Sequence, residues 1–122
     1  MHASLSLPLS QHQGVSLAQL LAGPAAALPP AVGVNGLLDC QGTPEEAAAE
    51  AAALLQRQPY AALKIKVGRR ADPLEDAAAV LAIRQAVGPA VVLRADANRR
   101  WTLEQAVQVR SPACIGVCCF EQ

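Results

Sequence analysis

The same helix-start signal occurs three times along the chain, and short β-prone runs separate its occurrences. The signals are Thr43-Pro44-Glu45-Glu46, Asp72-Pro73-Leu74-Glu75 and Thr102-Leu103-Glu104-Gln105. Each matches a capping box, in which the side chain of the first residue and that of the fourth accept hydrogen bonds from each other's backbone N–H groups. Each therefore predicts a helix of about a dozen residues, and Gly88-Pro89 predicts the end of the second helix.

Four β-prone runs alternate with these helices, at 31–38, 61–67, 90–97 and 115–121. The order β-α-β-α-β-α-β predicts an α/β fold built from right-handed βαβ units around a parallel sheet. The pattern fits an open doubly wound sheet and a (β/α) barrel equally well. The first predicted βα turn lacks G-x-G-x-x-G, and the chain contains no G-x-x-x-x-G-K-[ST], which argues against nucleotide binding.

Composition excludes several other classes of function. Ten basic and ten acidic residues make the 122-residue chain formally neutral, which argues against nucleic acid or an anionic membrane as a partner. No apolar run approaches the roughly 18 residues of a transmembrane helix. The four cysteines lack zinc-ligand spacing and are interpreted as small buried apolar residues. The first residues lack the basic region of a secretory signal and the arginines of a transit peptide, so an intracellular protein is expected.

Polar residues gather where the predicted strands end. The carboxyl ends of parallel strands meet at one edge of the sheet, where α/β proteins carry their functional residues. Residues two apart in a strand share one face, so the lysines of one run and the polar residues of the next are expected to converge. The residues concerned are Lys64 and Lys66 in the second run, Arg94, Asp96 and Asn98 in the third, and Glu121 in the fourth.

This set of side chains predicts proton abstraction assisted by a metal ion. Carboxylate oxygens from Asp96 and Glu121 suit Mg²⁺, and Mg²⁺ beside a substrate carboxylate stabilises the enolate that forms when an α-proton leaves. A lysine acts as a base near neutral pH only when its pKa is lowered, and a second ammonium group together with Mg²⁺ lowers it. The alternative interpretation is a surface strand with two solvated lysines, followed by a turn formed by Asp96 and Asn98.

Four stretches also carry a family resemblance: LKIKVGRR, AVLAIRQAVG, VVLRADANRRWT and the terminal FEQ. Over about residues 15–121 the chain resembles the muconate-lactonizing-enzyme branch of the enolase superfamily. Within that branch it is most similar to o-succinylbenzoate synthase, especially the form in the multifunctional phylloquinone-biosynthesis protein of plants and algae. The resemblance implies a partial (β/α) barrel, of the TIM-barrel type, formed by about the first four βα units over 31–122. Residues 1–30 would then be a linker and the remnant of a capping domain.

The resemblance also implies a role for each candidate residue. Lys66 would be the acid/base that removes the α-proton, and Lys64 would tune its pKa and help to stabilise the enolate. Asp96 and Glu121 would bind Mg²⁺, with Asn98 as a hydrogen-bonding neighbour and Arg94 paired with the carboxylates. The implied reaction is the dehydration of a small carboxylate substrate in menaquinone or phylloquinone biosynthesis, in the chloroplast of a plant or alga and otherwise in the cytoplasm.

Two alternatives stay open beside this reaction. One is a racemase, a dipeptide epimerase or a cycloisomerase of the same superfamily, and the other is a non-catalytic remnant. The family also carries a third metal carboxylate and a further lysine on later strands, which this sequence does not contain. Pro112 is expected to interrupt the third helix. The chain is therefore expected to be a fragment that is inactive alone.

Overall fold

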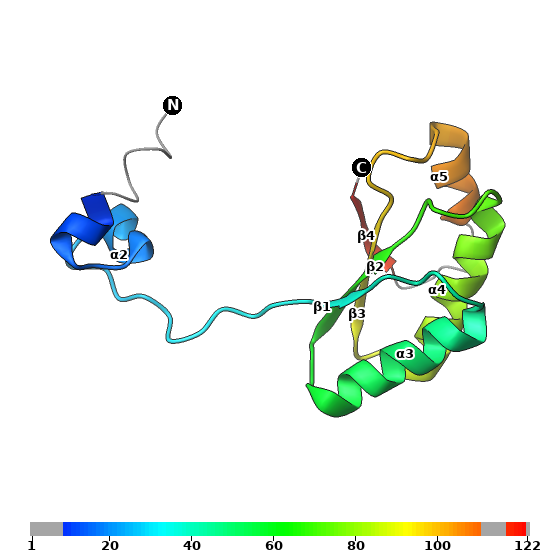
Figure 1. Cartoon of the computed structure of the whole chain (residues 1–122), viewed down its shortest axis with the longest axis horizontal. Helices are drawn as coiled ribbons and strands as arrows, with labels where there is room; N and C mark the ends of the chain where they lie inside the picture. Colours follow the sequence, from blue (N-terminus) through cyan, green and yellow to red (C-terminus); the bar gives the residue numbers. More distant parts are fainter. Residues whose placement is uncertain (1–8, 111–116, 122) are drawn as a thin grey trace. The chain divides into compact units, whose positions relative to one another are not determined.

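The computed structural model of the chain describes residues 9–110 and 117–121, which divide between two compact units, Met1–Val32 and Gly33–Gln122. The first unit contains α2 (Leu17–Ala22), drawn in blue in Figure 1. The side chain of Ser16 caps this helix by accepting a hydrogen bond from the Gln19 N–H, with 3.1 Å between N and Oγ. No helix in the described part of the chain is both long enough and apolar enough to span a bilayer.

The second unit is a four-stranded parallel sheet with its helices on one side (Figure 1). Its elements are β1 (Gly36–Leu38), α3 (Pro44–Arg57), β2 (Ala62–Lys66), α4 (Pro73–Val87), β3 (Val92–Asp96), α5 (Leu103–Val109) and β4 (Val117–Glu121). The strands lie in the order β1-β2-β3-β4, and α4 packs against both α3 and α5. A doubly wound sheet would reverse its strand order and carry helices on both faces. The arrangement is therefore that of a partial (β/α) barrel, as the resemblance implied.

The core lies between the sheet and these helices. Leu63 and Ile65 of β2 are fully buried, whereas Lys64 and Lys66 between and after them are only half-buried. This alternation places the apolar side chains of the strand under the helices and its lysines on the opposite face. Gly36 lets β1 approach closely, because a Cβ there would lie 2.6 Å from Cδ2 of Leu63.

Two of the three predicted capping boxes are complete. Thr43 and Glu46 exchange hydrogen bonds at the start of α3, and Thr102 and Gln105 do so at the start of α5. At α4 the prediction is wrong in detail. Asp72 caps the helix through the Leu74 N–H, but the Glu75 N–H donates to the backbone carbonyl of Asp72 instead of to its side chain.

Two elements are shorter than the sequence predicts. Helix α5 has seven residues and ends at Val109, and Pro112 lies outside the described residues. Strand β1 has three residues because it pairs only with Leu63, Lys64 and Ile65 of β2. The end of the second helix is confirmed, since α4 stops at Val87 with Gly88 as its C-cap.

Candidate functional site

Strand register brings the two lysines next to the predicted metal carboxylate. In the pairing of β2 with β3, Lys64 lies beside Arg94 and Lys66 lies beside Asp96. In the pairing of β3 with β4, which shifts register between Leu93 and Arg94, Glu121 lies beside Asp96. The predicted convergence of the lysines and Asp96 at the carboxyl end of the sheet is therefore present.

Both lysines contact a single oxygen atom of Asp96. Nζ of Lys66 lies 2.8 Å from Oδ2 of Asp96, and Nζ of Lys64 lies 3.0 Å from the same oxygen. The other oxygen, Oδ1, accepts a hydrogen bond from the Asn98 N–H at 3.0 Å. The side chain of Asp96 is 10% exposed, while those of Lys64 and Lys66 are 26% and 22% exposed. We call Lys64, Lys66 and Asp96 the lysine–aspartate cluster.

These contacts keep Asp96 ionised. The hydrogen bond from Lys66 holds the pKa of the Asp96 carboxyl well below its usual value, and the hydrogen bonds from Lys64 and the Asn98 N–H act in the same direction. Burial acts in the opposite direction and is outweighed. Within these three residues two amines share one anionic oxygen, on a half-buried face of the sheet. Amines held at a strand end can bind an anionic ligand, and a small carboxylate is the simplest one.

The turn after β3 supplies the third donor to Asp96. Asn98 has a φ of 50°, in the left-handed region that asparagine tolerates better than most residues. Its backbone N–H, in the turn that follows Asp96 directly, makes the bond to the carboxylate. The predicted neighbour of the metal ligand therefore contacts that ligand through its main chain.

Arg94 lies beside Lys64 on the same face of the sheet. Among the described contacts it forms no ion pair with Asp96, and its pairing with the carboxylates of the site stays a prediction. The Nε atom of Arg94 is buried and has no hydrogen-bond partner there. A buried N–H group without an acceptor lowers the stability of the fold. An acceptor that reached Nε of Arg94 would remove that cost.

A metal ion at this edge of the sheet would meet the carboxylate of Asp96. Asp96 is anionic and sits at the strand end, and the backbone of Glu121 pairs with it in register. The side chain of Glu121 lies outside the described part of the structure. Within that part, no group of three or more His, Cys, Asp or Glu side chains is placed to share a metal ion.

A second polar cluster was missed in the sequence. Asp76 of α4 is fully buried, and its carboxylate accepts hydrogen bonds from the Gly68 N–H and from Arg70, both at 2.8 Å. The signal was available, because Asp76 falls on the same helical stripe as the buried Val80 and Ile83. We call Gly68, Arg70 and Asp76 the arginine–aspartate cluster.

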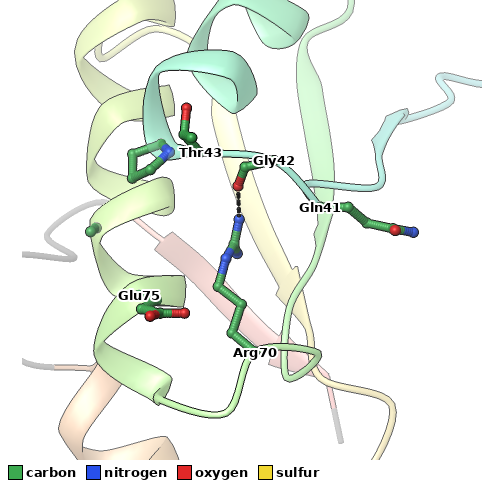
Figure 2. A pocket seen from close by; sticks show the side chains of 7 residues that line it. Gln41, Gly42, Thr43, Arg70 and Glu75 are labelled. Carbon is green, nitrogen blue, oxygen red and sulfur yellow. Dashed lines mark hydrogen bonds between the residues drawn. The ribbon is translucent and has the colours of Figure 1, made fainter.

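A pocket of about 470 Å³ adjoins this second cluster (Figure 2). Its walls come from the β1–α3 loop, the start of α3, the β2–α4 loop and the start of α4. The lining residues are Gln41, Gly42, Thr43, Pro44, Arg70, Glu75 and Ala78. None of the lysine–aspartate cluster lines it, so the two polar features are separate.

The sequence of this chain matches one family among the known protein families compared with it. The profile of the family described as "Enolase C-terminal domain-like" matches residues 46–122. Protein PHYLLO, chloroplastic, from Arabidopsis thaliana is 47% identical over 81 residues, which are 66% of this chain and 5% of that protein. The L-Ala-D/L-Glu epimerase of Bacillus subtilis is 48% identical over 65 residues, which are 53% of this chain and 17% of that protein.

Solved structures agree with this result. The substrate-liganded complex of the Bacillus subtilis L-Ala-D/L-Glu epimerase matches 97% of this chain and 32% of its own, with a TM-score of 0.81 and 34% identity. A dipeptide epimerase from Cytophaga hutchinsonii, complexed with Mg and the dipeptide D-Ala-L-Val, matches 86% of this chain and 27% of its own, with a TM-score of 0.69 and 27% identity. The chain thus spans less than a third of each of these relatives.

Proposed function

The chain belongs to the enolase C-terminal domain-like family, and on that premise we propose that its lysine–aspartate cluster removes the proton next to a substrate carboxylate. One observation carries the proposal. Two amines on β2 lie 2.8 and 3.0 Å from one carboxylate oxygen on β3, at the carboxyl end of the sheet. That end is where barrels of this type carry their active sites.

Within the cluster the two lysines take different roles. Lys66 is the last residue of β2, so it is the lysine nearest the mouth of the barrel and takes the proton from the substrate carbon. Lys64 lies two residues before Lys66 in β2, further from the carboxyl end of the strand. It adds positive charge beside the negative charge that develops on the substrate. Asp96 holds both amines at the strand end and keeps them on one face.

Mg²⁺ belongs to the same proposal. When bound, it would supply positive charge that stabilises the negative charge developing on the substrate carboxylate. Asp96 would hold it through carboxylate oxygens, which are the ligands Mg²⁺ prefers, and Glu121 is its neighbour in register. The solved complex of the Cytophaga hutchinsonii epimerase with Mg supports this assignment.

We assign the reaction to o-succinylbenzoate synthase. Lys66 takes the α-proton, the neighbouring carbon then loses its hydroxyl group as the double bond forms, and the proton on Lys66 passes to that hydroxyl group, so water leaves and the amine is neutral again. The similarity to the Arabidopsis protein PHYLLO supports this choice, together with a place in phylloquinone or menaquinone biosynthesis and a chloroplast location in a plant or alga.

Dipeptide epimerisation is the second candidate. The Bacillus subtilis epimerase is as similar in sequence as the Arabidopsis protein, and its fold matches nearly all of this chain. In that reaction the α-carbon regains a proton from the opposite side, and no water leaves. Both candidates share the first step, so the lysine–aspartate cluster serves either of them.

A chimera tests the role of Lys66 in the setting of a longer relative. Residues 33–121 of this chain replace the matching segment of the Bacillus subtilis epimerase, and exchange of the substrate α-proton is followed by NMR in D₂O. Lys66→Ala should abolish exchange for the epimer whose α-proton faces Lys66, while Mg²⁺ affinity persists. Undiminished exchange of both epimers would rule out Lys66 as the base.

Calorimetry tests the role of Asp96. Asp96→Asn should weaken Mg²⁺ binding about tenfold or more, because it removes an anionic oxygen ligand. Asp39→Asn is the matched control, since Asp39 is an exposed carboxylate in the adjoining β1–α3 loop. Equal affinities in the two variants would contradict the assignment. Parallel assays with the cyclohexadiene substrate of o-succinylbenzoate synthase and with L-Ala-L-Glu then decide between the two reactions.

A further inference from the structure

In the arginine–aspartate cluster, the Gly68 N–H and Arg70 donate hydrogen bonds to a carboxylate that is shielded from water. The side chain of Asp76 is 1% exposed. Its Oδ2 accepts the Gly68 N–H and its Oδ1 accepts Nη1 of Arg70, each at 2.8 Å. A buried carboxylate is tolerated only when its oxygens are paired in this way. Both donors come from the loop that begins directly after Lys66.

Arg70 also forms a hydrogen bond with the neighbouring β1–α3 loop. Its second nitrogen, Nη2, donates to the carbonyl of Gly42 at 2.5 Å, as the dashed line in Figure 2 shows. Gly42 directly precedes Thr43, which caps α3. Arg69 adds an ion pair to Asp39 at 2.6 Å. The β2–α4 loop is therefore joined at two points to the β1–α3 loop.

Gly68 joins the same loop to the β3–α5 loop. It has a φ of +76°, and a Cβ there would lie 3.1 Å from Cβ of Arg100 and 3.2 Å from the carbonyl oxygen of Ala97. The residue before it, Val67, donates its N–H to the carbonyl of Asp96 at 3.1 Å. The backbone that follows Lys66 thus lies between Asp76 on one side and the turn after Asp96 on the other.

We propose that Asp76 is a positioning residue for Lys66. By holding Gly68 and Arg70, it fixes the loop that continues β2 and so keeps Lys66 opposite Asp96. The inference rests on the proposed function, because it gives Asp76 a role only through the lysine–aspartate cluster. A purely structural Asp76 would change stability and leave the environment of the lysines unaltered.

The chain offers a direct readout, because Lys64 and Lys66 are its only lysines. Lysine labelled with ¹³C and ¹⁵N therefore gives two sets of side-chain signals, both from the cluster. Asp76→Asn keeps the volume but turns an amide toward one of the two donors. We expect it to displace both sets of lysine signals by an amount comparable with the displacement caused by Asp96→Asn.

Ile83→Ala is the matched control. Ile83 is a fully buried residue of the same helix, seven positions beyond Asp76, so its truncation destabilises the fold through a cavity. It should lower stability at least as much as Asp76→Asn and leave the lysine signals in place. Equal displacement in Ile83→Ala would show that the signals report general loosening, and would overturn the positioning role.

Arg70→Gln keeps the test decisive if Asp76→Asn does not fold. It removes the guanidinium group of a side chain that is 14% exposed, and leaves the Gly68 bond to Asp76 in place. A displacement of the Lys66 signals supports the positioning role. Unchanged lysine signals in Arg70→Gln, beside displaced signals in Asp96→Asn, overturn it and leave the proposed function standing. Unchanged signals in Asp96→Asn itself would contradict the lysine–aspartate cluster and both proposals.

Discussion

Asp76 and Asp96 are both buried carboxylates that face basic side chains, yet their surroundings differ in charge and in access to water. Asp76 faces one guanidinium and one backbone N–H, so its cluster is neutral, and its side chain is 1% exposed. Asp96 faces two ammonium groups whose side chains are 22% and 26% exposed. The first cluster is closed to water, whereas the second is partly open to it.

The difference is the one expected between a structural carboxylate and the functional carboxylate that we propose Asp96 to be. A closed, balanced pair leaves nothing for a ligand to satisfy, and its value lies in the geometry that it fixes. A partly exposed cluster of ionised groups at the carboxyl end of a parallel sheet presents charge that a ligand can meet. The sequence positions agree, since Asp76 lies within a helix stripe and Asp96 ends a strand.

Removal of one basic side chain from each cluster should give the largest contrast in stability. Arg70→Met leaves Asp76 buried with a single backbone donor, at a cost of about 3–5 kcal/mol. Lys64→Met leaves Asp96 with Lys66 and the Asn98 N–H, and should cost less than about 1 kcal/mol. Urea unfolding of both variants measures the difference. Equal losses would show that the two carboxylates are held alike.

Replacement of the whole closed pair should cost less than breaking it. Asp76→Leu combined with Arg70→Met removes both charges, and it leaves the Gly68 N–H without its acceptor and the exposed Gly42 carbonyl without its donor, at about 1–3 kcal/mol. The double variant should therefore unfold at higher urea than Arg70→Met alone. A double variant that is less stable than the single one would mean that the pair contributes more than mutual neutralisation.

Acid should weaken the open cluster through Asp96. The pKa of this carboxyl is lowered in the folded chain, so its ionised form stabilises the fold at pH values above 3.8. That contribution is lost as the pH falls below 3.8 toward the folded value. The difference in unfolding free energy between the unmodified chain and Asp96→Asn should therefore shrink in that window, as chemical denaturation at stepped pH can show. A difference that grew in acid would contradict the ion pairs.

Much of the fold and part of the candidate site could be predicted because both follow from short-range patterns. The period of two in a strand placed Lys64 and Lys66 on one face, and the βα repeat placed Asp96 on the next strand at the same end. The capping signals at Thr43 and Thr102 gave the starts of α3 and α5 for the same reason.

The parts that could not be predicted depend on tertiary contacts. Strand β1 pairs with only three of the five residues of β2, and this register is a tertiary contact that the sequence of β1 alone does not give. The bonds of Asp76 depend on the path of the β2–α4 loop, which the positive φ of Gly68 helps to define. Asp76 and Arg70 are six residues apart in the sequence, and only the folded loop shows that their side chains form an ion pair. The role of Glu121 stays a prediction, because its side chain lies outside the described residues.

The central claim is that the lysine–aspartate cluster is a site for Mg²⁺ and a carboxylate substrate. Titration of Mg²⁺ into the lysine-labelled chain tests it most directly, because every lysine signal comes from this cluster. We predict that Mg²⁺ bound by the Asp96 carboxylate would change the charge beside both amines, so both sets of lysine signals shift and saturate, and that Asp96→Asn abolishes the shift. Lysine signals that do not shift when Mg²⁺ is added, or that shift equally in Asp96→Asn, would contradict the claim.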